Sequence, residues 1–209
     1  MAATGKKLCF TVEQDGGTTG SEPTRSTGVR PKRRSMRSEY AGVVYDLDGT
    51  LVDLVVDWDA VAADVQTVYT DAGVTPADRD LWTMLGEARE HGLYEAVEAA
   101  IAAHECDGAR ESHLLPYADE LVREVRPTAV CSLNCEAACR VALDTHDLTP
   151  HVGPVVGRDT VSTWKPDPEP LLHAVDGLGL SPEDVLFVGD SERDAVTAER
   201  AGTGFQWVD

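Results

Sequence analysis

Lysine is nearly absent from most of this chain. The 209-residue sequence has a single lysine after Lys32, at Lys165, and arginine supplies every other positive charge beyond residue 39. Residues 40–209 carry 33 Asp or Glu against 10 Lys or Arg, a net charge of −23. Such an excess strains the compact state by self-repulsion, which salt at molar concentration screens. We therefore expect a cytosolic protein of a halophile, with neither nucleic acid nor an anionic membrane surface as a partner.

Cysteines and long apolar runs are also scarce. The five cysteines are an odd number with no evident disulfide framework, which is typical of a reducing cytosol. Cys131, Cys135 and Cys139 are spaced four residues apart, and we expect small buried thiols there rather than a metal pair. No stretch approaches the roughly 18 apolar residues that span a bilayer. The pair Arg33-Arg34 is not followed by the apolar segment of a secretion signal, so we expect a cytoplasmic location.

Beyond residue 39 the sequence is patterned, whereas residues 1–39 are not. The first segment holds eight Lys or Arg, is rich in Gly, Ser and Thr, and predicts a disordered basic tail, with a functional basic arm as the alternative. Beyond it, short apolar runs at 42–45, 129–131, 152–156, 185–188 and 204–208 alternate with helical spacing at 114–125, 136–143, 169–178 and 193–201. This alternation predicts an α/β fold, a parallel sheet with helices on both faces.

A helical stretch interrupts the alternation after the first strand. Residues 58–72 and 78–104 carry apolar residues at helical spacing, and Gly73 and Pro76 separate the two segments. We predict a small helical cap inserted into the sheet domain. The expected division of the patterned region is a cap at 55–112 and a core domain made of 40–54 and 113–209.

Polar side chains follow four of the predicted strands. In an open α/β sheet, ligands bind beyond the carboxyl ends of the strands, so these positions are the first candidates for a site. They are Asp46-Leu47-Asp48-Gly49-Thr50, Ser132-Leu133-Asn134, Lys165, and Gly189-Asp190 with Asp194. A turn explains any one of them, but independent turns do not bring carboxylates, a hydroxyl and an ammonium to one edge.

In this order, the four segments resemble the four motifs of the haloacid dehalogenase (HAD-like) superfamily. The resemblance covers the chain from about residue 41 to residue 209. It implies a Rossmann-type parallel sheet with a helical cap inserted after the first strand. It also implies a phosphatase of the phosphoglycolate phosphatase-like group, which acts on a small phosphorylated metabolite through an aspartyl-phosphate.

The same resemblance implies a role for each candidate residue. Asp46 would attack phosphorus, and Asp48 would protonate the leaving alkoxide and then activate water. Lys165 would neutralise charge that develops during transfer. Magnesium prefers oxygen ligands, and its binding residues would be Asp46, Asp48 through its backbone carbonyl, Asp190, and Asp194 through water or as a support. The residues that would bind the phosphoryl group are Ser132, Asn134, Gly49 and Thr50.

Other members of the superfamily are excluded or remain as alternatives. Haloacid dehalogenases lack the second aspartate, so Asp48 argues against them. Phosphonoacetaldehyde hydrolases use a cap lysine, and residues 55–112 contain none. A sugar phosphomutase of the same superfamily is the alternative to a phosphatase, and a non-catalytic binding protein on the same fold ranks last.

The expected cap offers a few residues that could approach a substrate. Those that could meet an anionic group are Arg79, Arg89, His91 and Arg110. Trp58, Trp82 and Tyr94 are expected to form the core of the cap rather than a ligand platform. We expect the cap to open and close over the site, with residues 50–53 as its first hinge.

Overall fold

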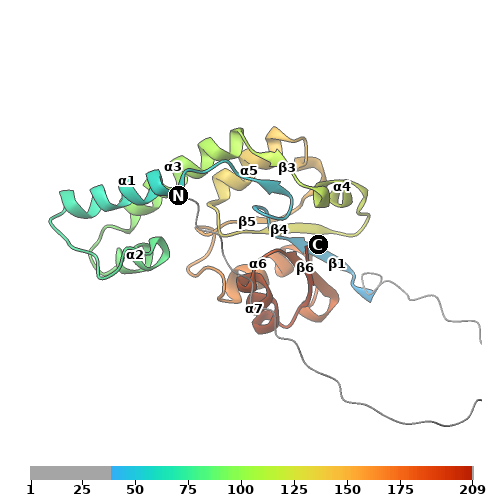
Figure 1. Cartoon of the computed structure of the whole chain (residues 1–209). Helices are drawn as coiled ribbons and strands as arrows, with labels where there is room; N and C mark the ends of the chain where they lie inside the picture. The colour runs from blue at the N-terminus through green and yellow to red at the C-terminus, as the bar shows by residue number, and fades with distance from the viewer. Residues whose placement is uncertain (1–38, 209) are drawn as a thin grey trace, which may run out of the picture. The chain divides into compact units, whose positions relative to one another are not determined.

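A five-stranded parallel sheet lies at the centre of the structure, a computed structural model that describes residues 39–208 (Figure 1). The strand order is β5-β4-β1-β6-β7. The strands are β1 (Gly42–Tyr45), β4 (Thr128–Cys131), β5 (Val155–Val156), β6 (Val185–Gly189) and β7 (Gly204–Trp207). The sheet confirms the predicted α/β fold. The tail expected at residues 1–39 lies, apart from Glu39, outside the described residues and stays a prediction.

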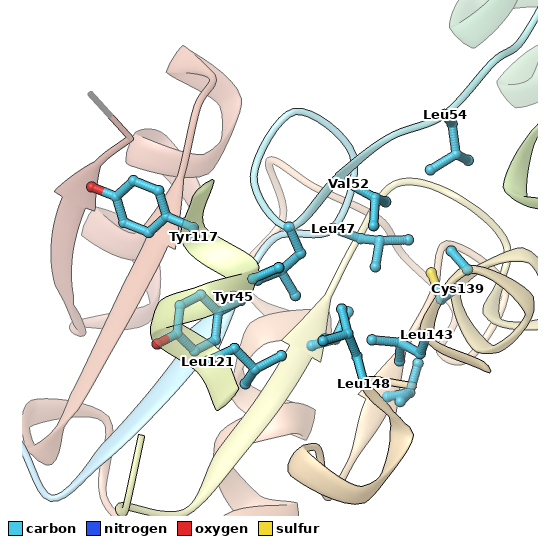
Figure 2. Close-up of a cluster of buried hydrophobic side chains, with 14 of the residues drawn as sticks. Tyr45, Leu47, Val52, Leu54, Tyr117, Leu121, Cys139, Leu143 and Leu148 are labelled. Carbon is cyan, nitrogen blue, oxygen red and sulfur yellow. The ribbon is translucent and has the colours of Figure 1, made fainter. Parts of the chain in front are cut away.

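Helices cover both faces of the sheet, as the alternation predicts. Because successive side chains of a strand point to opposite faces, Val43 and Tyr45 of β1 pack on one side and Val44 on the other. Figure 2 shows the first side, where Tyr45 packs with Leu121 and other apolar residues. The helices on that side are α4 (Pro116–Arg123) and α5 (Glu136–Thr145), and those on the other are α6 (Glu169–Leu178) and α7 (Glu192–Ala201). Short 3-10 turns lie at Thr149–His151 and Pro182–Asp184.

Three helices form the insertion after the first strand. They are α1 (Trp58–Asp71), α2 (Leu81–Glu87) and α3 (Tyr94–Arg110), and they share an apolar cluster of their own that includes Val61, Leu85 and Ile101. The insertion begins after β2 (Val52–Asp53) and ends at β3 (His113–Leu114). These two short strands pair antiparallel, so both connections of the insertion lie side by side. β2 also falls within the predicted hinge.

The second helical segment differs from its prediction. Instead of one helix at 78–104, the chain forms α2 and α3 with a break between them, where Gly92 adopts φ = 69°. A left-handed residue ends the regular spacing that the apolar pattern suggested. Helix α3 then continues to Arg110, and residues along it belong to two different apolar clusters. Ile101 packs with α1 and α2, whereas Ala109 packs in the core cluster that contains α5.

The cysteines beyond Cys9 behave as small apolar residues. Cys131, Cys135 and Cys139 are buried free thiols, as expected, and Cys106 is partly buried. Cys135 Sγ accepts the N–H of Ala138 at 3.4 Å and so caps the first turn of α5. In the part of the chain that the structure describes, no helix is long and apolar enough to cross a membrane.

Candidate active site

The strand ends meet around one small cavity of about 170 Å³. It lies where β1, β4 and β6 end, as expected for an open parallel sheet. The predicted site residues that line it are Asp46, Asp48, Ser132, Asn134, Lys165 and Asp190. The cavity is also lined by Leu133, Ser191, Arg193, Trp58 and Trp82. Gly49, Thr50 and Asp194, also expected at the site, lie just outside this lining.

Lys165 is held between two carboxylates at the base of the cavity. Its Nζ donates to Asp46 Oδ1 at 2.9 Å, to Asp194 Oδ1 at 2.5 Å and to the carbonyl of Cys131 at 3.2 Å. The side chain is only 2% exposed. Burial alone would lower the pKa of Lys165, but the charges of Asp46 and Asp194 outweigh burial and raise that pKa above its ordinary value. Lys165 is therefore a fixed positive charge beside Asp46.

Asp46 directly follows β1 and is anchored by its backbone. Its N–H donates to the carbonyl of Val188 at 2.8 Å, and the residue is only 6% exposed. Burial raises the pKa of the Asp46 carboxyl, and the adjacent Lys165 ammonium opposes that rise by favouring the carboxylate. The arrangement presents a largely buried carboxylate to the cavity, and the Lys165 ammonium on one side of it balances its charge.

Asp48 stands two residues further along, in a different environment. Its Oδ1 accepts the N–H of Leu54 at 2.8 Å, which fixes the carboxyl group against the connection to the insertion. Burial raises the pKa of Asp48 to about 6, and the negative charges of Asp53 and Asp190 add to this rise. A group with such a pKa gains and loses a proton readily near neutral pH, as an acid–base catalyst must.

Asp46, Asp190 and Asp194 form an acidic cluster. One carboxylate oxygen from each lies within 4.8 Å of the others. Gly49 allows this approach, because it adopts φ = 82° and a Cβ there would lie 2.3 Å from Asp190 Oδ2. Asp194 Oδ2 also accepts the N–H of Ser191 at 3.2 Å, and Ser191 Oγ accepts the N–H of Asp194 at 3.2 Å, so the two residues cap α7. Carboxylate oxygens are the ligands that Mg²⁺ prefers, so the cluster is consistent with a magnesium site.

The loop after β4 presents a hydroxyl and an amide to the cavity. Ser132 Oγ donates to Asn134 Oδ1 at 3.1 Å and accepts the N–H of Asn134 at 3.2 Å. Asn134 Nδ2 in turn donates to Glu105 Oε1 at 3.3 Å. The loop therefore depends on a carboxylate of helix α3 for its position.

Thr50 is fully buried, and its hydroxyl has no hydrogen-bond partner within residues 39–208.

A buried ion-pair network supports that loop and was not anticipated from the sequence. Arg158, fully buried after β5, donates through Nη2 to Glu98 Oε1 at 2.7 Å. Its Nη1 donates to Glu105 Oε1 and to the Leu133 carbonyl, each at 2.7 Å. The two glutamates come from α3, so the network links the insertion to the loop that lines the cavity. The partners are far apart in sequence, which leaves no local pattern to reveal them.

The insertion contributes different residues from those expected. Trp82 and Tyr94 pack against the apolar cluster of the insertion, as expected, but Trp82 also lines the cavity. For Trp58 the expectation was wrong, because this residue lines the cavity and is exposed. None of the four candidate cations of the cap is among the described residues that line the cavity. Arg89, for example, stacks on Tyr94 and donates to the carbonyl of Ser162. The arginine found at the cavity is Arg193 of the sheet domain.

Comparisons with known proteins identify the family of this chain. A family model described as a haloacid dehalogenase-like hydrolase matches residues 40–202. The chain is 32% identical over 183 residues to a phosphoglycolate phosphatase of Cereibacter sphaeroides, covering 78% of this chain and 83% of that protein. It is 29% identical over 196 residues to a phosphoglycolate phosphatase of Mesorhizobium japonicum, covering 80% and 82%.

Solved structures give the same answer for the fold. A HAD-superfamily hydrolase of subfamily IA from Geobacter sulfurreducens is similar with a TM-score of 0.55 and 27% identity, over 79% of this chain and 88% of that one. A hydrolase from Pseudomonas syringae is similar with a TM-score of 0.59 and 22% identity, over 79% and 83%. Since the family model spans most of the chain and the motif residues meet at one cavity, this protein belongs to the haloacid dehalogenase-like hydrolases.

Proposed function

We propose that this chain is a magnesium-dependent phosphatase that hydrolyses a small phosphomonoester, such as 2-phosphoglycolate, through an aspartyl-phosphate on Asp46. The observation that carries the proposal is the pairing of buried Asp46 with Lys165 in a cavity that Asp48 also lines. The curated relatives named phosphoglycolate phosphatases support the substrate class. The small size of the cavity also favours a short substrate, since pockets that bind drug-sized ligands have volumes of about 300–1,000 Å³.

In the first step, a carboxylate oxygen of Asp46 attacks phosphorus and the bond from phosphorus to the ester oxygen breaks. Protonated Asp48 gives its proton to the departing alkoxide, which leaves as the alcohol. Lys165 stays charged and stabilises the negative charge that collects around the transferring group. Ser132 and Asn134, which also line the cavity, would donate hydrogen bonds to phosphoryl oxygens.

In the second step, the same groups act in reverse. Asp48, now a carboxylate, takes a proton from water, and the water oxygen attacks phosphorus. The bond from phosphorus to Asp46 breaks, which releases inorganic phosphate and restores the Asp46 carboxylate. A pKa of about 6 for Asp48 suits both roles, because neither protonation state is far from neutral pH.

The residues present fit a magnesium ion. Its ligands would come from the side chains of Asp46 and Asp190 and the backbone carbonyl of Asp48. Asp194 would act through water or as a support, because Lys165 and Ser191 already bond to its two oxygens. When bound, the metal supplies positive charge that offsets repulsion between the phosphate and the clustered carboxylates.

The test is release of inorganic phosphate from a panel of small phosphomonoesters that includes 2-phosphoglycolate, in KCl with magnesium. We expect release by the wild type, its loss on chelation with EDTA, and a fall of at least about 10³-fold in kcat for Asp46→Asn. Asp71→Asn makes the same chemical change at an exposed position on α1 and should keep wild-type activity. Residual turnover by Asp46→Asn within tenfold of the wild type would contradict the assignment of the nucleophile.

A further inference from the structure

Arg193 occupies a position in the cavity that the proposed phosphoryl chemistry does not use. It lies in the first turn of α7, and in the sequence it stands between the acidic residues Asp190 and Asp194. Its side chain lines the cavity and is partly exposed. Its guanidinium makes no hydrogen bond or ion pair to any other residue between positions 39 and 208. A positive charge facing a cavity that also presents three aspartates is therefore left available to a ligand.

The other cations near the cavity are already bound. Lys165 is shared by Asp46 and Asp194, and Arg158 is enclosed by two glutamates and a backbone carbonyl. Since Lys165 and Arg193 are the cationic residues among the described lining, a second anionic group on a substrate would find its counter-charge at Arg193. A guanidinium suits this task, because its planar fork matches a carboxylate with two parallel hydrogen bonds.

Two tryptophans of the insertion, Trp58 and Trp82, line the cavity together with Arg193. The Cζ atom of Arg193 lies 5.7 Å from the centre of the Trp82 ring, and Trp58 also lines the cavity. Asp80, just before α2, has a lowered pKa, mainly because the N–H and hydroxyl of Thr83 donate to it, with a smaller contribution from the charge of Arg193. Aromatic rings exclude water, and a charged hydrogen bond is stronger where water is excluded.

We propose that Arg193 binds a carboxylate of the substrate and thereby selects short phosphorylated carboxylic acids over uncharged phosphoesters. The inference rests on the proposed function, since Asp46 must receive the phosphoryl group at the other end of the same cavity. A volume of about 170 Å³ leaves little room between the two ends, so the carboxylate belongs close to the ester carbon. Trp82 then acts as the wall that keeps the guanidinium directed into the cavity.

The experiment compares two substrates that differ only in the carboxylate. They are 2-phosphoglycolate and ethyl phosphate, which have the same two-carbon skeleton. We expect the wild type to prefer 2-phosphoglycolate in kcat/KM, and Arg193→Gln to reduce the ratio of the two kcat/KM values by at least about tenfold, mainly through KM. Arg193→Lys keeps the charge without the fork and should give an intermediate ratio.

Arg79→Gln is the matched control, because it removes the same charge from the insertion at a position outside the cavity lining. It should leave the ratio unchanged, which separates direct contact from long-range attraction of anions. An unchanged ratio in Arg193→Gln and Arg193→Lys, with an active wild type, would overturn the assignment of Arg193 alone. If the wild type released phosphate from neither ester, the proposed function would fail, and the role of Arg193 with it.

Discussion

Gly49 decides how closely Asp190 approaches the other acidic residues. Its backbone is left-handed, and the space that a Cβ would take is occupied by the carboxylate of Asp190. Any side chain at this position therefore carries two costs. One is the strain of a positive φ, which is about 1–2 kcal/mol for a non-glycine residue. The other is displacement of Asp190 from the cluster that would hold magnesium.

We predict that Gly49→Ala raises the magnesium concentration needed for half-maximal activity by at least about tenfold, as expected when a ligand loses its support. Gly179→Ala provides the matched control. Gly179 also has a positive φ, of 69°, but a Cβ there would meet nothing within 4 Å. Both variants should lose stability in thermal melts through the strain of a positive φ, whereas only Gly49→Ala should change the magnesium dependence. Equal magnesium dependence in both would contradict the assignment of Asp190 as a magnesium ligand that Gly49 holds in place.

Single site residues can be predicted from the sequence when they stand directly after a strand. Asp46, Ser132 and Asp190 could be placed together because the carboxyl ends of parallel strands share one edge. Arg193 and Trp82 could not, since their presence at the cavity depends on how α7 and the insertion pack in space. Lys165 was a candidate partly because it is the single lysine after Lys32, whereas Arg193 is one of several arginines in the same region.

Helix α3 connects two parts of the structure. Its N-terminal half packs with α1 and α2, and its C-terminal half packs against α5 of the sheet domain. Between them, Glu105 is completely buried and accepts from Arg158 and from the N–H of Cys135. Burial alone would lower the pKa of Arg158, but bonds from its guanidinium to the two glutamates raise it, so Arg158 stays charged. The position of the Ser132 loop thus depends on an element of the insertion.

We predict that Glu105→Ala lowers the free energy of unfolding by about 3–5 kcal/mol, because it leaves Arg158 buried with one of its two carboxylate partners removed. Asp107→Ala is the control on the same helix. Asp107 also pairs with an arginine, Arg110, but its side chain is 82% exposed, and its loss should cost less than about 1 kcal/mol. Urea denaturation of both variants measures the difference. A loss below about 1 kcal/mol for Glu105→Ala would mean that Arg158 does not depend on Glu105 to compensate its buried charge.

Most helices and strands were predictable from the sequence, and the elements that were missed are short or interrupted. The apolar runs of β1, β4 and β6 are short and buried on both faces, which gives an unambiguous signal. The pair β2–β3 was missed, since each strand has only two residues and its partner lies across the insertion. The break between α2 and α3 was missed because apolar spacing resumes in register after Gly92.

The whole molecule carries far more negative than positive charge. Of the 10 Lys and Arg residues beyond residue 39, six already form ion pairs with carboxylates; Arg140 with Glu136 and Arg126 with Glu124 are two of these pairs. Few cations are therefore left to offset the remaining Asp and Glu residues. Repulsion among exposed carboxylates acts over the Debye length, which falls from about 10 Å at 0.1 M salt to about 3 Å at 1 M. The expected adaptation to high salt follows from this imbalance.

We predict that the melting temperature rises by at least about 5 °C between 0.1 M and 2 M KCl, because screening removes repulsion that only the folded state concentrates. Salt also strengthens apolar burial, so a variant with fewer charges separates the two effects. Replacing four exposed carboxylates by amides (Asp71, Glu90, Glu111 and Glu199) should raise the melting temperature in low salt and flatten its dependence on KCl. A wild-type melting temperature independent of KCl would refute self-repulsion, whereas an equal rise in both proteins would assign the effect to apolar burial.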